Sequence, residues 1–532
     1  MTKPAFRPEI IVGLVGGAGT RLSDLSARIR DRLKSFGYES SVIKLSELFE
    51  HCTDWSAPPV NEELKRIEHL QRIGTGFRKR LQSGDAAVLA AIAEIRRTRC
   101  NHSGDPEQPI SAHAYILHQL KHPDEVETLR RVYGPSFVLA AGHASKNSRI
   151  SALAKRAANA AFKPGNEDRF RGLATDIIGV DDQEDDPFGQ NTRDTYPKAD
   201  VFVNLGVNLG EQSIDRFIDL LFGHPFKTPT ADEYAMYQAS AVALRSSDDS
   251  RQVGSAIVSL TRDINNFNLI HNADVIAVGM NEVPRGGGGF YWDGATPDAR
   301  DQRLAQINDD RPRLIKLSVL AELLDRIAGQ KLLSDEVAHS DAKTLATSLL
   351  PILRGTQFMN IGEFGRPVHA EMAALIDAAR RGVAVNGLSM YVTTFPCHNC
   401  AKHIIAAGIR NVVYLEPYPK SRTAELYEEE VELDSDTARQ IEGKVVFSSF
   451  TGIGPRQYSQ LFSMSERGAK KGRSLKLWEN TRPELSPYYV PSLGYLQYIM
   501  QERAELQRLQ TDVYAWEQAS LLPTKDVHVR SD

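Results

Sequence analysis

The sequence predicts an α/β protein in which parallel β-sheets are flanked by helices. Short apolar strands alternate along the chain with amphipathic stretches of helical spacing, a pattern typical of parallel sheets covered by helices. The chain has 532 residues, of which 41% are hydrophobic and 25% are charged. This length and composition favour several domains with buried cores. We expect one domain at 1–225, a second at 226–465 and a helical tail at 466–532.

The composition excludes several classes of protein. A net charge of −4 argues against a strongly basic nucleic-acid coat. The longest apolar runs, such as residues 86–93, fall well short of the roughly 18 residues that a membrane-spanning helix needs. Four cysteines cannot form a disulfide framework in a chain of this length. The first thirty residues also lack the pattern of a secretory signal peptide. We therefore expect a cytoplasmic protein with no membrane partner.

The first domain opens with a buried strand at 9–15, followed by a helix at 22–36. Apolar runs and helical periodicity predict further strands at 41–45, 136–141 and 200–204, and further helices at 64–73, 86–96 and 124–132. Strands and helices that alternate in this way form a parallel sheet with helices on both faces. The acidic, irregular stretch 166–197 indicates a loop or lid.

A glycine-rich turn, GLVGGAGTRLS at 13–23, joins the first strand to the first helix. Phosphate-binding loops occupy this position, because their backbone N–H groups and the helix N-terminus attract phosphate. The candidate nucleotide-binding residues are Gly16, Gly17, Gly19 and Ser23. The motif is degenerate, because Leu22 stands where such loops carry the lysine that bridges the phosphates. We therefore expect no phosphoryl transfer by this domain.

The second domain is expected to begin with a helix at 231–245, after a junction rich in proline and glycine at 223–229. The remaining predicted elements are strands at 253–260, 275–280, 389–393 and 411–415, helices that begin near His369 and Cys397, a polar helical insertion at about 290–365, and a tail helix from Tyr495 to about Trp516.

The strongest functional signal combines one histidine with two cysteines. His369 and Glu371 form His-Ala-Glu, and Cys397 and Cys400 follow in Pro-Cys-His-Asn-Cys. One nitrogen and two sulfur ligands suit Zn²⁺, and three protein ligands leave a fourth position for water, as in catalytic zinc sites. Both cysteines begin a predicted helix, whose N-terminus stabilises thiolates. We expect one catalytic zinc per chain on His369, Cys397 and Cys400, with Glu371 as the proton shuttle.

The pairing of H-x-E with P-C-x-x-C is the signature of the zinc-dependent nucleobase deaminases. Over about 230–455 the sequence resembles this superfamily, most closely its deoxycytidylate deaminase branch, with DDSRQVGSAIV at 248–258 and AVGMNEVPRGG at 277–287. The resemblance implies an α/β/α cytidine-deaminase-like domain and hydrolytic attack on C4 of cytosine, with Glu371 moving the protons. It also implies that Asn281 contacts the deoxyribose hydroxyl. The alternative is that Asn281 only stabilises its own turn.

A nucleotide substrate needs cations for its phosphates. Arg251, just before the strand at 253–260, and Lys420 are candidate substrate-binding residues. The deaminase half lacks a long basic stripe interleaved with aromatic residues, which argues against an editor of single-stranded DNA or RNA. The short basic cluster 467–476 is interpreted as an exposed linker, with RNA or polyphosphate binding as the alternative.

A degenerate P-loop kinase-like domain ahead of a deoxycytidylate-type deaminase resembles the bacterial anti-phage dCTP deaminases. Residues 114–134 also resemble that family, and residues 198–221 look like the closing strand and helix of small-molecule P-loop kinases. The resemblance implies conversion of dCTP, and of dCMP, to uracil nucleotides during infection. It further implies assembly into hexamers and restraint by an inhibitory RNA.

Three alternatives stay open. A housekeeping dCMP deaminase, regulated by nucleotides through the kinase-like domain, would share every motif. A nucleotide- or RNA-sensing protein with a vestigial deaminase is disfavoured, because the His-Ala-Glu and Cys-His-Asn-Cys motifs are intact. A structural zinc site would need a fourth ligand, for which His398 and His403 are nearby candidates.

Overall fold

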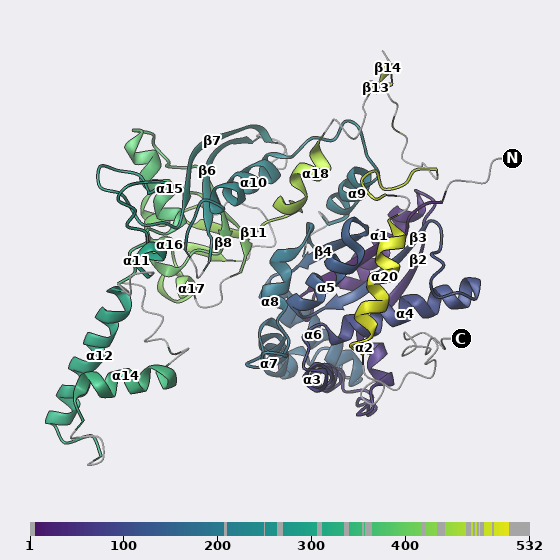
Figure 1. Cartoon of the computed structure of the whole chain (residues 1–532), viewed down its shortest axis with the longest axis horizontal. Helices are drawn as coiled ribbons and strands as arrows, with labels where there is room; N and C mark the ends of the chain where they lie inside the picture. The colour runs from purple at the N-terminus through teal and green to yellow at the C-terminus, as the bar shows by residue number, and fades with distance from the viewer. Residues whose placement is uncertain are drawn as a thin grey trace, which may run out of the picture. The chain divides into compact units, whose positions relative to one another are not determined.

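The structure is a computed structural model, shown in Figure 1. It describes residues 6–206, 210–248, 251–262, 270–305, 311–334, 340–353, 356, 364–417, 421–433, 442–463, 470–471, 474–475, 478, 484–491 and 494–509. The chain divides into two compact units. The first comprises Met1–Tyr237, Asn411–Pro419 and Tyr427–Asp532, and the second comprises Gln238–Arg410 and Lys420–Leu426.

The first unit is built around a six-stranded sheet with the order β12-β5-β4-β1-β3-β2. Its strands are β1 Ile10–Gly16, β2 Glu39–Lys44, β3 His113–Leu120, β4 Phe137–His143, β5 Val201–Asn204 and β12 Gly452–Ile453. The first five strands are parallel, and β12 pairs antiparallel with β5 at the edge. The parallel sheet predicted for the N-terminal half is therefore confirmed.

Both faces of this sheet are covered. Ile10, Val12 and Leu14 alternate along β1 and share one buried apolar cluster with residues of α1 and α9. Ile11 and Val15, which point to the other face, are equally buried. The helices of the unit are α1 Leu22–Lys34, α2 Leu45–Leu48, α3 Glu63–Leu81, α4 Ala86–Ser103, α5 Pro123–Tyr133, α6 Lys146–Ala160, α7 Arg171–Asp182, α8 Thr192–Thr195, α9 Gly210–Leu221, α18 Tyr458–Phe462 and α20 Tyr495–Leu506.

Three elements of this unit differ from the prediction, and one of them is the 15-residue helix α6, which no predicted helix covers. No strand is predicted at 113–120, yet β3 lies there between β1 and β2. The predicted loop or lid at 166–197 contains the 12-residue helix α7. Ala174, Ile177 and Ile178 give α7 a buried apolar face, which outweighs the acidic residues that follow it.

A second six-stranded sheet has the order β10-β11-β9-β8-β6-β7. Its strands are β6 Gly254–Arg262, β7 Ile270–Met280, β8 Ser389–Thr394, β9 Asn411–Glu416, β10 Val431–Leu433 and β11 Val445–Ser449. β6 pairs antiparallel with β7 and with β8, whereas β9, β11 and β10 are parallel to one another. Three helices accompany these strands: α10 Ala231–Ala243, α15 Ala370–Arg380 and α16 His398–Ala406.

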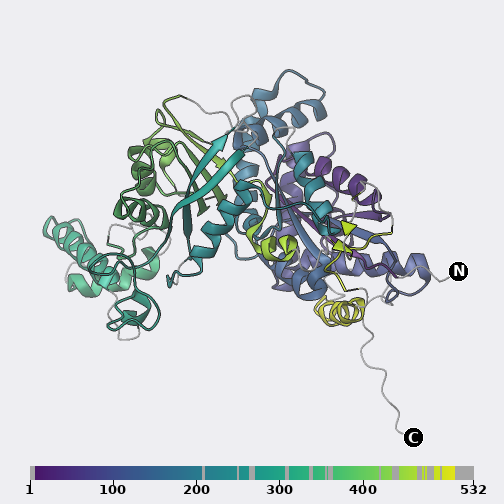
Figure 2. The ribbon, with the colours of Figure 1, turned by 90° about the horizontal axis from the view of Figure 1, so that it is seen from above.

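The predicted helical insertion contains α11 Asp301–Ala305, α12 Arg311–Gly329 and α14 Ala342–Leu353. α12 and α14 pack on each other around Leu320, Leu324 and Ala346, which form a small apolar cluster of their own. The pair is seen from two directions in Figure 1 and Figure 2. The base of the insertion is closed by Arg366, whose Nη1 lies 2.5 Å from Asp301 Oδ1.

Helix α20 belongs to the first unit, where it packs beside α4 and α5 (Figure 1). Arg99 of α4 is fully buried between two fully buried carboxylates. Its Nη1 lies 2.7 Å from Glu502 Oε2 in α20, and its Nη2 lies 2.9 Å from Glu9 Oε2. The predicted tail helix thus begins at Tyr495 and ends at Leu506, whereas residues 510–532 lie outside the described residues. Every helix of the described part of the chain is too short or too polar to span a lipid bilayer.

Candidate active site

The helix that follows His369 is seated directly on a strand. α15 begins after His369, which has an extended backbone, and its small buried residues are Ala370, Ala373 and Ala374. Gly279 of β7 permits this close approach, because a Cβ at that position would lie only 2.3 Å from the Ala374 nitrogen. The small residues on both elements therefore fix α15, and with it the histidine, against the sheet.

Cys397 and Cys400 lie at the start of α16, directly after strand β8. Cys397 precedes the first helical residue, and Cys400 is buried in the first turn. Their sulfur atoms lie 3.4 and 3.3 Å from His369 Nδ1. All three ligand atoms lie within 4.8 Å of one another. The structure thus brings together the three residues that the sequence proposes as ligands, here called the His–Cys–Cys cluster.

This donor set fits a zinc ion. Bonds of about 2.0–2.3 Å in a tetrahedron place neighbouring nitrogen and sulfur ligands about 3.5 Å apart. The nitrogen–sulfur distances of 3.3 and 3.4 Å agree with that spacing. Neither His398 nor His403 joins the cluster. His369 is exposed whereas Cys400 is buried, so the cluster is accessible from one side, as a catalytic metal requires.

Glu371 lies beside the cluster, in the first turn of α15. Only 4% of its surface is exposed, and its carboxyl group interacts with the Cys400 thiol. Burial raises the pKa of Glu371 to about 7. A carboxyl group with a pKa near neutrality can both accept and donate a proton, which suits general acid–base chemistry.

The two thiols share their protons unequally. A hydrogen bond from Cys400 lowers the pKa of Cys397 to about 4, and His369 adds to the effect. The same hydrogen bond, together with burial, raises the pKa of Cys400. The pair therefore favours one thiolate and one thiol. A dication bound here would deprotonate the second thiol as well.

The residues proposed to bind substrate are only partly described. Asn281 follows β7 and is 7% exposed. Its Oδ1 accepts a hydrogen bond from the Val253 N–H at 2.7 Å, and its Nδ2 donates to the Arg251 carbonyl at 2.8 Å. Asn281 therefore holds the segment that carries the exposed side chain of Arg251. Lys420 lies outside the described residues, and the substrate contacts of all three residues stay a prediction.

Glu282 is a buried residue of this region that sequence reasoning misses. It is 2% exposed, and its carboxylate accepts hydrogen bonds from the N–H and hydroxyl of Ser247 at 3.0 and 2.8 Å. Its backbone exchanges two hydrogen bonds with Val368, the residue directly before His369. Glu282 thereby ties the Asn281 turn to the start of α15. Its partners Ser247 and Val368 are distant in sequence, so no local pattern marks it.

The glycine-rich turn lies in the first unit and is shaped by packing. A Cβ at Gly19 would lie 2.6 Å from the Arg149 carbonyl oxygen, so this position needs glycine, whereas a Cβ at Gly17 would meet only the flexible end of the Arg149 side chain. Gly19 has a φ of +89°, in the left-handed region that glycine adopts without strain. Gly16 ends β1, and Ser23 is exposed in the first turn of α1. Nucleotide binding by these residues stays a prediction.

Comparison with known proteins adds a family to this geometry. Residues 229–416 match the family described as the cytidine and deoxycytidylate deaminase zinc-binding region. We call this segment the deaminase-type region. It contains the whole His–Cys–Cys cluster together with Glu371 and Asn281. The deaminase-type region therefore includes the predicted catalytic residues.

Three relatives show how far the likeness extends. The deoxycytidylate deaminase of Enterobacteria phage T2 is 47% identical over 55 residues, which are 10% of this chain and 29% of that protein. ComE operon protein 2 of Bacillus subtilis is 45% identical over 76 residues, 13% of this chain and 40% of that protein. The human deoxycytidylate deaminase is 47% identical over 47 residues, 9% of this chain and 25% of that protein. The chain thus spans between a quarter and two fifths of these relatives.

Among solved structures, the dCMP deaminase of cyanophage S-TIM5 in apo form shares 16% sequence identity at a TM-score of 0.21. The match covers 42% of this chain and 100% of that one.

Proposed function

We propose that the chain is a zinc-dependent enzyme that hydrolyses the C4 amino group of deoxycytidine nucleotides, dCTP and dCMP, to give deoxyuridine nucleotides and ammonia. The observation that supports this proposal is the His–Cys–Cys cluster with the buried carboxyl group of Glu371 beside it, inside a deaminase-type region. Relatives named deoxycytidylate deaminase favour the deoxycytidine branch of the family. When bound, one zinc ion per chain would supply a water nucleophile that is activated at neutral pH.

In this proposal Glu371 moves the protons. Its carboxylate accepts one proton from the attacking water and passes it to N3 of the cytosine ring. It then accepts the second proton from the hydroxyl group now bound to C4 and delivers it to the amino group, which leaves as ammonia while the C4 carbonyl forms. Burial removes bulk water from the carboxyl group, so the proton stays between Glu371 and the substrate.

Substrate positioning is assigned to three residues. Asn281 contacts the deoxyribose hydroxyl, and Arg251 and Lys420 contact the phosphates. Arg251 is suited to this role, because its exposed side chain is carried by the segment that Asn281 anchors. A guanidinium binds phosphate oxygens through several donors at once.

We further propose that the reaction depletes the deoxycytidine nucleotide pool in defence against phage. This part rests on the resemblance to the anti-phage dCTP deaminases. The same resemblance supports a homo-oligomer, such as a hexamer, and an inhibitory RNA as a further partner. A housekeeping dCMP deaminase is the competing proposal, and it differs by acting on dCMP without any dormant state.

The test is deamination by the zinc-loaded protein, measured as ammonia release and by product chromatography. Substrates are dCTP, dCMP, dCDP, CTP and cytidine, side by side, with single-stranded DNA as the polymer control. We expect deoxyuridine nucleotides from the deoxycytidine nucleotides. Deamination of single-stranded DNA without action on dCTP or dCMP would contradict the proposal.

A matched pair of variants tests the metal site. Cys397→Ser removes one ligand and should lose the metal. Cys100→Ser replaces a partly exposed cysteine of α4 and should keep one equivalent of zinc. Full zinc occupancy in Cys397→Ser would show that the metal binds elsewhere.

A further inference from the structure

The first unit contains a cavity that the proposed deamination does not use. Its volume is about 690 Å³, within the range of about 300–1,000 Å³ that is typical of small-molecule sites. Thr20 and Ser23 of the glycine-rich turn line it, together with Gln119 near the end of β3. Ligands of open α/β sheets bind at the carboxyl ends of the strands, which is where this cavity lies.

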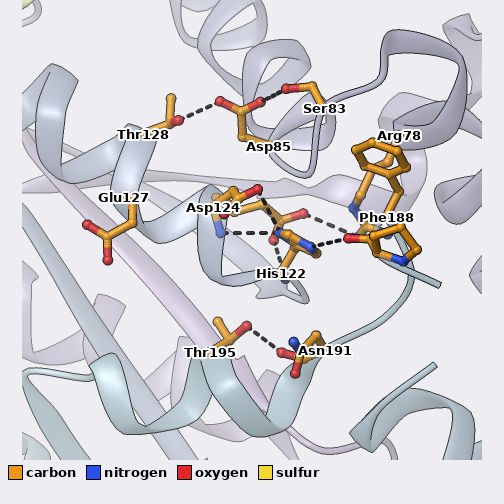
Figure 3. A network of polar contacts seen from close by, with 12 residues as sticks. Arg78, Ser83, Asp85, His122, Asp124, Glu127, Thr128, Phe188, Asn191 and Thr195 are labelled. Carbon is orange, nitrogen blue, oxygen red and sulfur yellow. Dashed lines mark hydrogen bonds and ion pairs between the residues drawn. The ribbon is translucent and has the colours of Figure 1, made fainter. Parts of the chain in front are cut away.

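Arg78 of α3 is the most informative residue of the cavity lining. It is 2% exposed, and its Nη2 donates to Glu125 Oε1 at 3.2 Å within the polar network of Figure 3. Its Nε and Nη1 have no hydrogen-bond partner among the described residues. Buried donors without a partner carry a free-energy penalty, which is larger for a charged group. Acceptor oxygens of a ligand would remove that penalty.

Two more polar atoms of the lining lack partners within the described part of the chain. They are Thr20 Oγ1, from the glycine-rich turn, and His118 Nε2, from β3. Next to His118, Gln119 has a φ of +79°, a left-handed conformation that costs free energy in any residue other than glycine. The unmet hydrogen bonds therefore belong to three residues, from different elements, that all line one cavity.

The remaining charges limit how much negative charge the ligand carries. The Ala18 N–H in the glycine-rich turn donates to Asp181 Oδ2 at 2.8 Å, and Lys121 forms an ion pair with the same carboxylate. A carboxylate thus occupies a position that phosphate takes in a phosphate-binding turn. Lys44 is also paired, with Glu47 at 2.7 Å. Arg66 and Arg156 both pair with Glu63, and Arg21 lies near Asp24. Among the lining cations that the structure describes, Arg78 is the one with buried donors that have no partner, which suits one phosphate group and not three.

The apolar part of the lining suits a nucleobase. Phe49 and Trp55 line the cavity, and aromatic side chains stack on the faces of bases. Three lining glutamines, Gln71, Gln119 and Gln190, offer amide groups that both donate and accept hydrogen bonds, as the edge of a base requires.

We propose that this cavity binds a nucleoside monophosphate, with the phosphate on Arg78 and the base against Phe49 and Trp55. The ligand is bound without being phosphorylated, because the buried side chain of Leu22 occupies the position of the catalytic lysine. This cavity is not part of the proposed deaminase site, because none of the residues that line it belongs to the His–Cys–Cys cluster.

The test is titration of the full-length protein with dTMP, dGMP and AMP, followed by calorimetry and by tryptophan fluorescence. These nucleotides lack cytosine, which avoids turnover. Arg78→Met should weaken binding by about 10-fold or more, because a charged hydrogen bond is lost. Arg72→Met, an exposed arginine on the same helix, should leave the affinity unchanged. Cys397→Ser should also bind normally, which separates this site from the deaminase-type region.

A second variant keeps the proposal falsifiable if Arg78→Met does not fold. Trp55 is only half-buried, so Trp55→Ala should fold, bind more weakly and lose the fluorescence change. The proposal is overturned if no nucleoside monophosphate binds at millimolar concentration, or if both variants bind like the wild type. Equal binding of inorganic phosphate or ribose 5-phosphate would likewise overturn the nucleoside assignment.

Discussion

At the scale of single residues, the Glu371 side chain is only 4% exposed and lies beside the Cys400 thiol. Replacing Glu371 by glutamine tests its role in proton transfer separately from its role in packing. Glutamine keeps the size of the side chain but cannot transfer a proton. We expect Glu371→Gln to retain zinc and thermal stability while kcat falls by about 10²–10⁴-fold or more. Steady-state kinetics with dCMP, metal analysis and thermal unfolding measure these three quantities. Glu322→Gln, on the exposed surface of α12, is the control that should change none of them, and near wild-type kcat in Glu371→Gln would assign the protons to another group.

Asp85 gives a prediction about pH. Burial alone would raise its pKa, but hydrogen bonds from Arg508, Ser83 and Thr128 outweigh burial and hold the pKa of Asp85 below its usual value; Figure 3 shows the bonds from Ser83 and Thr128. The ionised carboxylate therefore stabilises the fold above about pH 4, and that stabilisation is lost as the pH falls through the folded-state pKa.

We therefore expect Asp85→Asn to lower the free energy of unfolding by about 1–3 kcal/mol at pH 7, since a charged hydrogen-bond acceptor is removed. The difference from the wild type should shrink between about pH 5 and pH 3. Urea unfolding over a pH series measures it, with the exposed Asp31→Asn as the control. A difference that does not depend on pH would mean that Asp85 is not ionised in the folded protein.

The residues that the sequence predicts are those with local neighbours. His369, Cys397 and Cys400 belong to two short motifs, and each motif begins a helix, so their convergence follows from the spacing. The contacts of Glu282 and Asp181 were not predictable in this way. Each carboxylate accepts hydrogen bonds from segments far along the chain, and only the tertiary fold brings those donors near.

At the scale of elements, the buried ion pair between Glu502 and Arg99 holds α20 against the rest of the first unit. Replacing one partner of a buried ion pair leaves the other charge uncompensated and costs about 3–5 kcal/mol. We expect Glu502→Ala to destabilise the first unit by that amount in chemical unfolding. Arg503→Ala on the same helix breaks only an exposed pair with Glu107, and should cost less than about 1 kcal/mol. Equal effects of the two variants would show that Glu502 contributes no more than a surface charge.

The helical insertion gives a second prediction at this scale. α12 and α14 have their own apolar cluster, and Arg366 already brings the two ends of the insertion together. Replacing residues 306–363 by a short glycine-serine linker should therefore preserve one equivalent of zinc in the purified protein. Metal analysis and circular dichroism measure the result. A metal-free or unfolded product would show that the insertion supports the His–Cys–Cys cluster.

Elements were predicted well where an apolar run or a periodic apolar face is long, as in β1 and β4, and poorly elsewhere. β3 escapes prediction because its apolar run is only four residues long, from Ala114 to Leu117, and polar residues flank it, so local pattern does not distinguish it from a buried helical turn. α7 escapes because acidic residues and glycines around it favour a loop, whereas its buried face depends on packing against α3 and α6. Short apolar runs and packing between distant elements leave little trace in local periodicity.

At the scale of the whole molecule, the proposed zinc ligands all lie in the second unit. Removing zinc with a chelator should abolish deamination and lower the unfolding temperature of that unit, because metal binding stabilises the folded state alone. Adding zinc back should restore both. Calorimetry of chelated and reloaded protein measures the shift in unfolding temperature. The unfolding temperature of Cys397→Ser should not change on chelation. Undiminished activity after complete removal of zinc would contradict the metal assignment.

The meeting of Glu9, Arg99 and Glu502 also sets an order of events on the ribosome. Arg99 leaves the exit tunnel early, and the entire second unit, up to residue 426, is synthesised before Glu502 follows. The edge strand β12, which pairs with β5, is likewise synthesised only after the second unit. During synthesis domains generally fold from the N-terminus onward. Here the second unit is fully synthesised first, whereas the first unit, which contains the earliest residues, gains its last contacts only after Glu502 has been made.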